Sequence, residues 1–186
     1  VIRHGVTRDN VLGLEAVIAD GTVLSSLSKV LKNNTGYDLR QLFVGSEGTL
    51  GIVTRALFRL HPNPAVTANA LISLNSVKNA LDLLARLRTA LGPRISAFEG
   101  IWPQVYAGIA TLRPLPIPAG AGMYVVAEIH GFDPEADRPA FENALMSAIE
   151  DGLCQDVVMS QSEREFHDIW AIREGSNDYT RALGPV

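Results

Sequence analysis

Between residues 66 and 160 the sequence twice predicts the order strand, helix, strand, because runs rich in β-branched residues alternate with stretches of helical periodicity. In chain order, these six elements cover residues 66–74, 77–91, 94–101, 123–131, 133–152 and 155–160. Ser76 is a suitable N-cap for the first helix, and Gly92 and Pro93 are suited to end it. This order is typical of a ferredoxin-like α+β sandwich, an antiparallel sheet with helices on one face.

Two more helices are expected, a short one over residues 102–110 and a long one over residues 162–183. In the leucine-rich helix over residues 77–91, helical spacing predicts an inward stripe of Val77, Leu81, Leu84, Leu87 and Leu91. In the helix over residues 133–152, the same spacing turns Phe141, Leu145 and Ile149 inward.

The first 60 residues are predicted to be rich in β-strand. The stretch LEAVIAD ends in Asp20-Gly21, a strong signal for a hairpin turn, and NNTGYD over residues 33–38 predicts a loop. Residues 52–60 alternate as a strand does, with the face of Ile52 and Phe58 expected in a core. Two prolines in HPNPA, residues 61–65, indicate a linker.

We therefore expect two parts, residues 1–62 and residues 63–186. The chain opens without a methionine and already in strand-like rhythm, and it closes just after a predicted helix. Both ends are typical of cuts through a larger protein, so we expect a fragment whose second part is incomplete at its C-terminus.

The composition is that of a globular protein that does not bind nucleic acid. Hydrophobic residues make up 47% and charged residues 19%, the net charge is −4, and the 16 Lys and Arg are scattered. The single cysteine, Cys154, is expected to be a small buried residue in a reducing compartment, which predicts a cytoplasmic location. No apolar run has the roughly 18 residues of a transmembrane helix. The four histidines lack ligand spacing, so no metal site is predicted.

Gly45, Gly48 and Gly51 recur at every third position just before the alternating run that begins at Ile52. A sharp turn feeding a strand explains such glycines, because glycine readily adopts positive φ. Bare backbone also lets a flat ligand approach closely. The segment is no P-loop, since no Gly-Lys-Ser/Thr follows, and no dinucleotide fingerprint, since a strand rather than a helix comes next. The residues alone leave the turn and the ligand contact as open alternatives.

Residues 12–24 (LGLEAVIADGTVL) and 32–54 (KNNTGYDLRQLFVGSEGTLGIVT) resemble the FAD-linked oxidases of the vanillyl-alcohol-oxidase and para-cresol-methylhydroxylase superfamily. The nearest resemblance is to the branch of D-lactate dehydrogenase, D-2-hydroxyglutarate dehydrogenase and the glycolate oxidase FAD subunit. Over the rest of the chain, the order of elements resembles that of the family's substrate-binding cap domain. The resemblance implies that residues 1–62 are the C-terminal part of an FAD-binding domain and residues 63–186 are the cap.

The resemblance implies FAD as the cofactor. Matched by position, it assigns the FAD contacts to Gly45, Ser46, Glu47, Gly48, Gly51 and Ile52. The family's glycine-rich pyrophosphate loop is expected upstream of these residues. Its lysine, metal-binding histidines and catalytic histidine are expected downstream, so no catalytic residue is assigned here.

Arg173 continues an apolar stripe of the last predicted helix, on the face of Ile169 and Trp170. An inward arginine needs an anionic partner, either a substrate carboxylate, which suits its planar fork, or a structural acid such as Glu99 or Glu128. The family's Trp-x-x-Arg-Glu motif implies the first role for Arg173, and it implies a substrate-facing position for Asn177, one turn later. Trp102 and Tyr106, four residues apart, either line the same cleft or pack in the core.

By resemblance, the parent enzyme oxidises a D-2-hydroxy acid of the lactate, glycolate or 2-hydroxyglutarate type to a 2-oxo acid, with hydride transfer to flavin N5. Two alternatives are a non-catalytic fragment or accessory subunit without FAD, and a flavin-dependent transferase similar to alkylglycerone-phosphate synthase. The expected partner is a small 2-hydroxy acid. The electron acceptor, a homodimer of the parent and peripheral membrane association are left open.

Overall fold

The protein is described from a computed structural model that covers residues 1–27 and 36–182. It has two compact units, Arg3–Asn63 and Pro64–Val186, whose boundary falls inside the proline-containing segment 61–65. Residues 33–35 of the expected loop and residue 183 of the last predicted helix lie outside the described residues.

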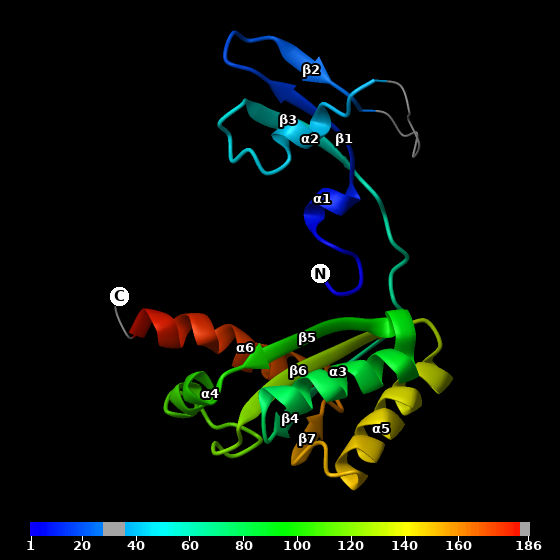
Figure 1. Cartoon of the computed structure of the whole chain (residues 1–186), viewed down its shortest axis with the longest axis vertical. Helices are drawn as coiled ribbons and strands as arrows, with labels where there is room; N and C mark the ends of the chain where they lie inside the picture. The colour runs from blue at the N-terminus through cyan, green and yellow to red at the C-terminus, as the bar shows by residue number, and fades with distance from the viewer. Residues whose placement is uncertain (28–35, 183–186) are drawn as a thin grey trace. The chain divides into compact units, whose positions relative to one another are not determined.

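The second unit is built on a four-stranded antiparallel sheet with the strand order β5-β6-β4-β7 (Figure 1). Its strands are β4 (Val66–Leu74), β5 (Ile95–Ile101), β6 (Met123–Gly131) and β7 (Asp156–Met159). Its helices are α3 (Val77–Leu91), the 3-10 turn η1 (Gly92–Arg94), α4 (Pro103–Ala110), α5 (Pro134–Glu150) and α6 (Glu163–Ala182). As expected, Ser76 caps α3, with its Oγ accepting a hydrogen bond from the backbone N–H of Asn79 at 3.2 Å.

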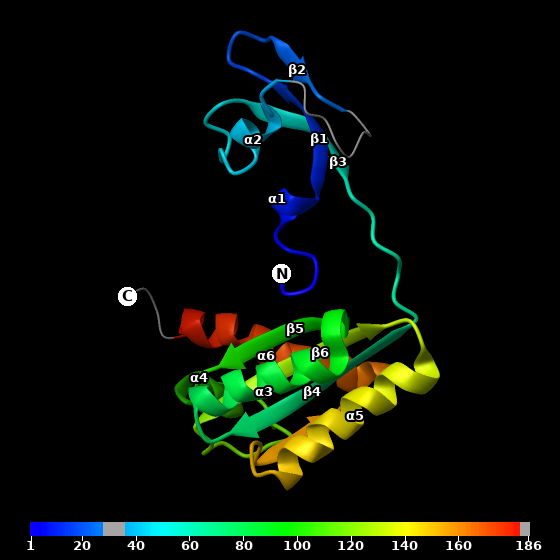
Figure 2. The ribbon, with the colours of Figure 1, turned by 45° about the vertical axis from the view of Figure 1, so that its right-hand side comes forward.

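Helices cover both faces of this sheet (Figures 1 and 2). The two long helices α3 and α5 pack side by side on one face, and α4 and α6 pack together on the other. The predicted α+β class, with an antiparallel sheet and a ferredoxin-like order of elements, is confirmed. Helices were expected on one face of the sheet, and the structure has them on both, because α4 and α6 cover the second face. The second helical layer, α4 and α6, adds a covered surface where polar side chains of the sheet meet α6.

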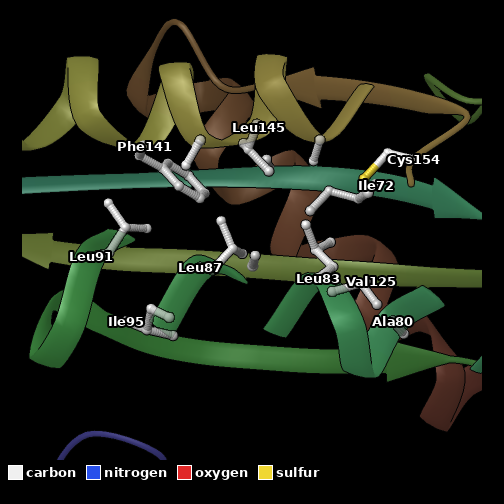
Figure 3. Close-up of a cluster of buried hydrophobic side chains, with 14 of the residues drawn as sticks. Ile72, Ala80, Leu83, Leu87, Leu91, Ile95, Val125, Phe141, Leu145 and Cys154 are labelled. Atoms are coloured by element: carbon white, nitrogen blue, oxygen red, sulfur yellow. The ribbon is translucent and has the colours of Figure 1, made fainter. Parts of the chain in front are cut away.

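The main core lies between the sheet and the helices α3 and α5 (Figure 3). Its largest fully buried side chains from these helices are Leu83, Leu87, Leu91, Phe141 and Leu145. Two positions of the expected α3 stripe, Val77 and Leu81, are exposed instead. In a helix with so many leucines two overlapping stripes satisfy helical spacing, and the contact with α5 selects the one that contains Ala80 and Leu83.

A second core lies under α4 and α6. The rings of Tyr106 and Tyr124 stack with their centroids 3.5 Å apart, and the Tyr106 hydroxyl donates to the Ile117 carbonyl at 2.7 Å. Burial raises the pKa of the Tyr106 phenol above its ordinary value. The two helices approach closely at Gly108, where a Cβ atom would lie 2.2 Å from the Tyr179 ring.

Asp137, 3% exposed, joins the end of β6 to the start of α5. Its Oδ2 accepts hydrogen bonds from the backbone N–H groups of Phe132 and Asp133 at 2.7 and 3.0 Å, and its Oδ1 pairs with Arg94 at 2.5 Å. The Asp133 amide, then the Phe132 amide and Arg94, hold the pKa of Asp137 below its ordinary value, which outweighs the opposing effect of burial.

The substitution Asp137→Asn is expected to lower the free energy of unfolding at pH 7 by about 2 kcal/mol, since it leaves charged and amide donors with a weaker acceptor. Because the folded-state pKa is depressed, this stabilisation is present above the unfolded pKa of about 3.9 and is lost as pH falls through the folded value. Urea unfolding of the intact protein should show a difference in the free energy of unfolding between wild type and Asp137→Asn at pH 7, and this gap should narrow near pH 3. Asp82→Asn, at an exposed carboxylate, is the control, and an equal gap at both pH values would contradict the assignment.

The first unit contains a three-stranded antiparallel sheet with the order β2-β1-β3. Its elements are α1 (Thr7–Asn10), β1 (Val11–Val17), β2 (Val23–Ser25), α2 (Arg40–Phe43) and β3 (Ile52–Phe58). The predicted Asp20-Gly21 hairpin is confirmed, with φ +85° at Gly21. The core of this unit consists of Leu14, Ala16 and Phe43.

The expectation of a buried face on β3 is wrong within this structure. Every residue of β3 is exposed except Leu57, which is half-buried. Alternation identifies the two faces of a strand but does not say what covers either of them. The core of the unit forms on β1 and α2 instead.

Cys154 is buried, as predicted. Burial raises the pKa of its thiol to about 11, which keeps it protonated and unreactive near neutral pH. Across the described ranges, no helix combines the length and the apolar character needed to cross a bilayer.

Candidate functional site

The glycine segment forms a tight turn between α2 and β3. The amide of Thr49 donates to the Ser46 carbonyl at 3.0 Å, and the two residues between them, Glu47 and Gly48, have φ of +50° and +80°. Positive φ at both central residues is the pattern of a type I′ turn. A non-glycine residue such as Glu47 adopts it at a cost of roughly 1 kcal/mol, and strained residues of this kind cluster at ligand sites.

The three glycines differ in what requires them. A Cβ atom on Gly51 would lie 2.6 Å from the Val17 carbonyl oxygen, and one on Gly45 would lie 2.4 Å from Arg8 Nη2. A Cβ atom on Gly48 would meet nothing within 4 Å of the described residues. Gly51 is therefore explained by packing against the backbone of β1, whereas Gly45 and Gly48 are explained by their backbone conformations, with φ of +91° and +80°.

The exposed surface of this turn offers both polar and apolar groups for contact. Among the described residues, the amides of Glu47 and Gly48 donate no hydrogen bond, and successive free N–H groups in a turn favour an anionic or carbonyl oxygen. Ile52, four residues after Gly48, is 71% exposed and offers an apolar side chain for contact. An isoalloxazine ring has this combination of a flat apolar body and polar edges.

Helix α6 begins with a hydrogen-bonded cap and lies across the sheet. Ser162 Oγ accepts from the Glu165 amide at 3.2 Å, and Glu165 Oε2 accepts from the Gln161 amide at 2.6 Å. From the sheet, buried Asn69 donates through its side-chain amide to the Phe166 carbonyl at 2.9 Å. These contacts fix the start of the helix.

Arg173 lies on the sheet-facing side of α6, where helical spacing predicts it. Its Nε and Nη2 atoms both approach Glu99 Oε2 at 3.4 Å, and the two side chains are about equally exposed, 40% and 42%. The structural alternative of an ion pair is thus realised with Glu99, while Glu128 takes other partners. The pair is longer than the usual charge-assisted distance, and at 40% exposure the Arg173 side chain remains accessible. Asn177, one turn further on, is exposed.

Glu128 is the centre of a hydrogen-bonded cluster that sequence reasoning missed. It is 8% exposed and accepts from Trp170 Nε1 at 2.6 Å and from Ser96 Oγ at 2.6 Å, and His130 Nε2 lies 2.8 Å from its Oε1. The signal was present in the strand MYVVAEIHG, since a carboxylate inside an apolar strand requires polar partners. Glu128 and His130, two residues apart, share the α6-facing side.

Tyr106 packs in the core, the second of the two expectations for the Trp102–Tyr106 pair, and Trp102 is 57% exposed. A pocket of about 390 Å³ lies between residues 113–116, β7 and α6, but Arg173 does not line it. Its charged lining consists of Arg113, Glu165 and Asp168, so it gives no clear preference for an anionic substrate, and we do not place the site there. In the part of the chain that the structure describes, no three His, Cys, Asp or Glu side chains are placed to share a metal ion.

The sequence is similar to curated D-2-hydroxyglutarate dehydrogenases along its whole length. It is 38% identical over 192 residues to a protein of Oryza sativa subsp. indica named "Probable D-2-hydroxyglutarate dehydrogenase, mitochondrial", covering 100% of this chain and 34% of that protein. It is 36% identical over 190 residues to the mitochondrial D-2-hydroxyglutarate dehydrogenase of Arabidopsis thaliana, again covering 100% and 34%. The chain therefore spans about a third of the length of the curated relatives it matches.

Solved structures show where else this fold occurs. An alkyldihydroxyacetonephosphate synthase matches with a TM-score of 0.65 at 15% identity, over 95% of this chain and 34% of that one. A substrate-bound p-cresol methylhydroxylase matches with a TM-score of 0.56 at 17% identity, over 85% of this chain and 37% of that one. At these identities the likeness shows the fold alone, and it does not favour the transferase alternative.

The expected cytoplasmic location is wrong. The relatives from rice, Arabidopsis thaliana and Bos taurus are named as mitochondrial enzymes. The presence of a single cysteine indicates a reducing rather than an oxidising compartment, but it does not distinguish one reducing compartment from another.

The model of the family described as "FAD linked oxidases, C-terminal domain" matches residues 63–185, a range that includes the whole sheet of the second unit, α6 and Arg173. With the similarity to the two dehydrogenases, this confirms the resemblance seen in the sequence, and with it FAD as the cofactor. The chain belongs to the FAD-linked oxidases and carries their C-terminal domain.

Proposed function

We propose that the intact protein is an FAD-dependent oxidoreductase that oxidises a D-2-hydroxy acid, of the lactate, glycolate or 2-hydroxyglutarate type, to a 2-oxo acid. The observation that carries this proposal is the accessible guanidinium of Arg173 on the sheet-facing side of α6, held only loosely by Glu99. The relatives named D-2-hydroxyglutarate dehydrogenase support the same class of substrate.

Arg173 binds the substrate carboxylate in this proposal. A planar guanidinium can form two parallel hydrogen bonds to a carboxylate, which fixes both the position and the orientation of the acid. Asn177 adds a polar side chain one turn further along α6. A bound acid held in this way loses the freedom that otherwise opposes reaction, and this is the contribution that residues 63–186 make as the substrate-binding cap.

FAD, when bound, supplies the acceptor for the hydride of the substrate's α-carbon. Residues 1–62 belong to its binding domain in this proposal, and the contacts are assigned to Gly45, Ser46, Glu47, Gly48, Gly51 and Ile52. The free amides of Glu47 and Gly48 suit the polar edge of the ring, and the exposed side chain of Ile52 suits its apolar body.

Anaerobic mixing of the intact flavoprotein with D-lactate or D-2-hydroxyglutarate tests this function. We expect the visible absorbance of oxidised flavin to bleach with at least one of the two acids, and not with propionate or glutarate, which lack the hydroxyl group. Bound flavin that stays oxidised with every hydroxy acid would contradict the proposal. An intact protein that neither contains nor takes up FAD would favour the accessory subunit instead.

A further inference from the structure

Two glutamates on neighbouring strands hold two side chains that lie three residues apart on α6. Glu128 of β6 accepts from Trp170 Nε1 at 2.6 Å, and Glu99 of β5 accepts from Arg173 Nε and Nη2 at 3.4 Å. The contact to Trp170 is short and largely buried, whereas the contact to Arg173 is long and half-exposed. The two contacts therefore contribute differently: the first fixes the helix, and the second orients the guanidinium.

Glu128 is suited to fix α6 because several partners hold its own side chain in place. Its Oε1 accepts from Ser96 Oγ at 2.6 Å and lies 2.8 Å from His130 Nε2, while its Oε2 is left for Trp170. A buried carboxylate is stable only when its oxygens have such partners, and once it has them it cannot move without breaking several hydrogen bonds. Trp170 is thereby anchored to a rigid part of the sheet.

Anchoring Trp170 sets the rotation of α6 about its axis at Arg173, since residues three apart lie on the same face of a helix. Glu99 then occupies the Nε edge of the guanidinium, and Arg173 Nη1 donates to no described side chain. The Nη1 end of the guanidinium is therefore left to bind a ligand, in one orientation. Because Glu99 already restricts the Arg173 side chain, little further conformational entropy is lost on binding.

We propose that Glu128 is a positioning residue, which acts through Trp170 to orient Arg173 for the substrate carboxylate. This inference rests on the proposed function. It predicts that loss of the Glu128–Trp170 hydrogen bond weakens substrate binding through Arg173, without removing FAD and without a matching loss of kcat.

Trp170→Phe in the intact enzyme removes the donor and keeps an aromatic ring. With D-2-hydroxyglutarate or D-lactate as substrate, we expect KM to rise about tenfold, as befits the loss of one hydrogen bond to a charged group, while kcat changes much less and FAD content is unchanged. Trp102→Phe is the matched control, because the side chain of the other tryptophan is exposed, and its KM should stay at the wild-type value. Glu128→Asp, which withdraws the carboxylate by one methylene, should change KM in the same direction and serves if Trp170→Phe does not fold.

A double-mutant cycle separates positioning from general destabilisation. In an Arg173→Ala background, Trp170→Phe should have no further effect on KM, because the group it orients is gone. Additive effects, or a wild-type KM in both Trp170→Phe and Glu128→Asp, would overturn the positioning role. Failure of the proposed function gives a different result, since Arg173→Ala alone would then leave KM unchanged.

Discussion

Replacing Arg173 with alanine is expected to raise KM for a D-2-hydroxy acid by about a hundredfold and to lower kcat, while FAD content stays at the wild-type level. A bidentate, charge-assisted contact is among the strongest that a small acid can make, and its loss leaves the carboxylate without a partner. The flavin contacts proposed for residues 45–52 do not involve this side chain, so the cofactor should be retained. Steady-state kinetics with an artificial electron acceptor and a flavin absorbance spectrum measure both quantities.

Two further variants show whether the shape or the charge of Arg173 matters. Arg173→Lys keeps the charge and loses the fork, so it should recover only part of the affinity. Arg164→Ala is the matched control, because Arg164 lies on the same helix, is exposed and pairs only loosely with Asp168 at 3.8 Å. If Arg173→Ala behaved like Arg164→Ala, Arg173 would be a structural partner of Glu99 and the proposed site would be lost.

Gly51→Val is expected to yield an intact protein with little or no bound FAD. A Cβ atom there would lie 2.6 Å from the Val17 carbonyl oxygen and 3.3 Å from Phe43, so β1 and β3 cannot keep their present pairing at Val17 and Ile52. The core of the first unit is small, with Leu14, Ala16 and Phe43 as its buried apolar members, and it has little reserve against such a clash. Flavin released by denaturation, relative to protein, gives the occupancy.

Gly48→Ala separates a flavin contact from a folding defect. Its Cβ atom meets nothing within 4 Å of the described residues, so the expected cost is only the roughly 1–2 kcal/mol of placing a side chain at φ +80°. If Gly48 contacts the cofactor, occupancy should fall clearly while the unfolding temperature changes little. Full occupancy in both Gly48→Ala and Gly51→Val would contradict the assignment of this turn to FAD.

The helices and strands of the second unit were predictable because local sequence patterns, such as hydrophobic periodicity and capping residues, determine them. Residues 66–74 match β4 at both ends, and Ser76 caps α3 as its residue type predicts. The inward stripe of α3 was not predictable to the same degree, because Val77 and Leu81 belong to one helical stripe and Ala80 and Leu83 to another. The neighbouring helix α5, far away in sequence, decides between them.

The candidate site was predictable only in part, for a similar reason. The inward position of Arg173 follows from 3.6-residue spacing, and Glu99 was one of two acids expected as an alternative partner. Glu128 instead accepts a hydrogen bond from Trp170. This contact depends on the register of β5 and β6 and on the placement of α6, and neither can be predicted from a local sequence pattern. The role of the glycine turn in FAD binding remains a prediction.

Helix α6 is held by contacts at several points along its length. Asn69 bonds its first turns, Glu128 its middle, and Gly175 and Tyr179 rest against Ile109 and Gly108 of α4. Because α6 is held on both sides of Arg173, it cannot shift along its axis or rotate about it to adjust to a smaller or larger acid. A change of substrate size in this scaffold would therefore have to come from the surroundings of Arg173, and mutations that alter the contacts supporting α6 should raise KM for all acids alike.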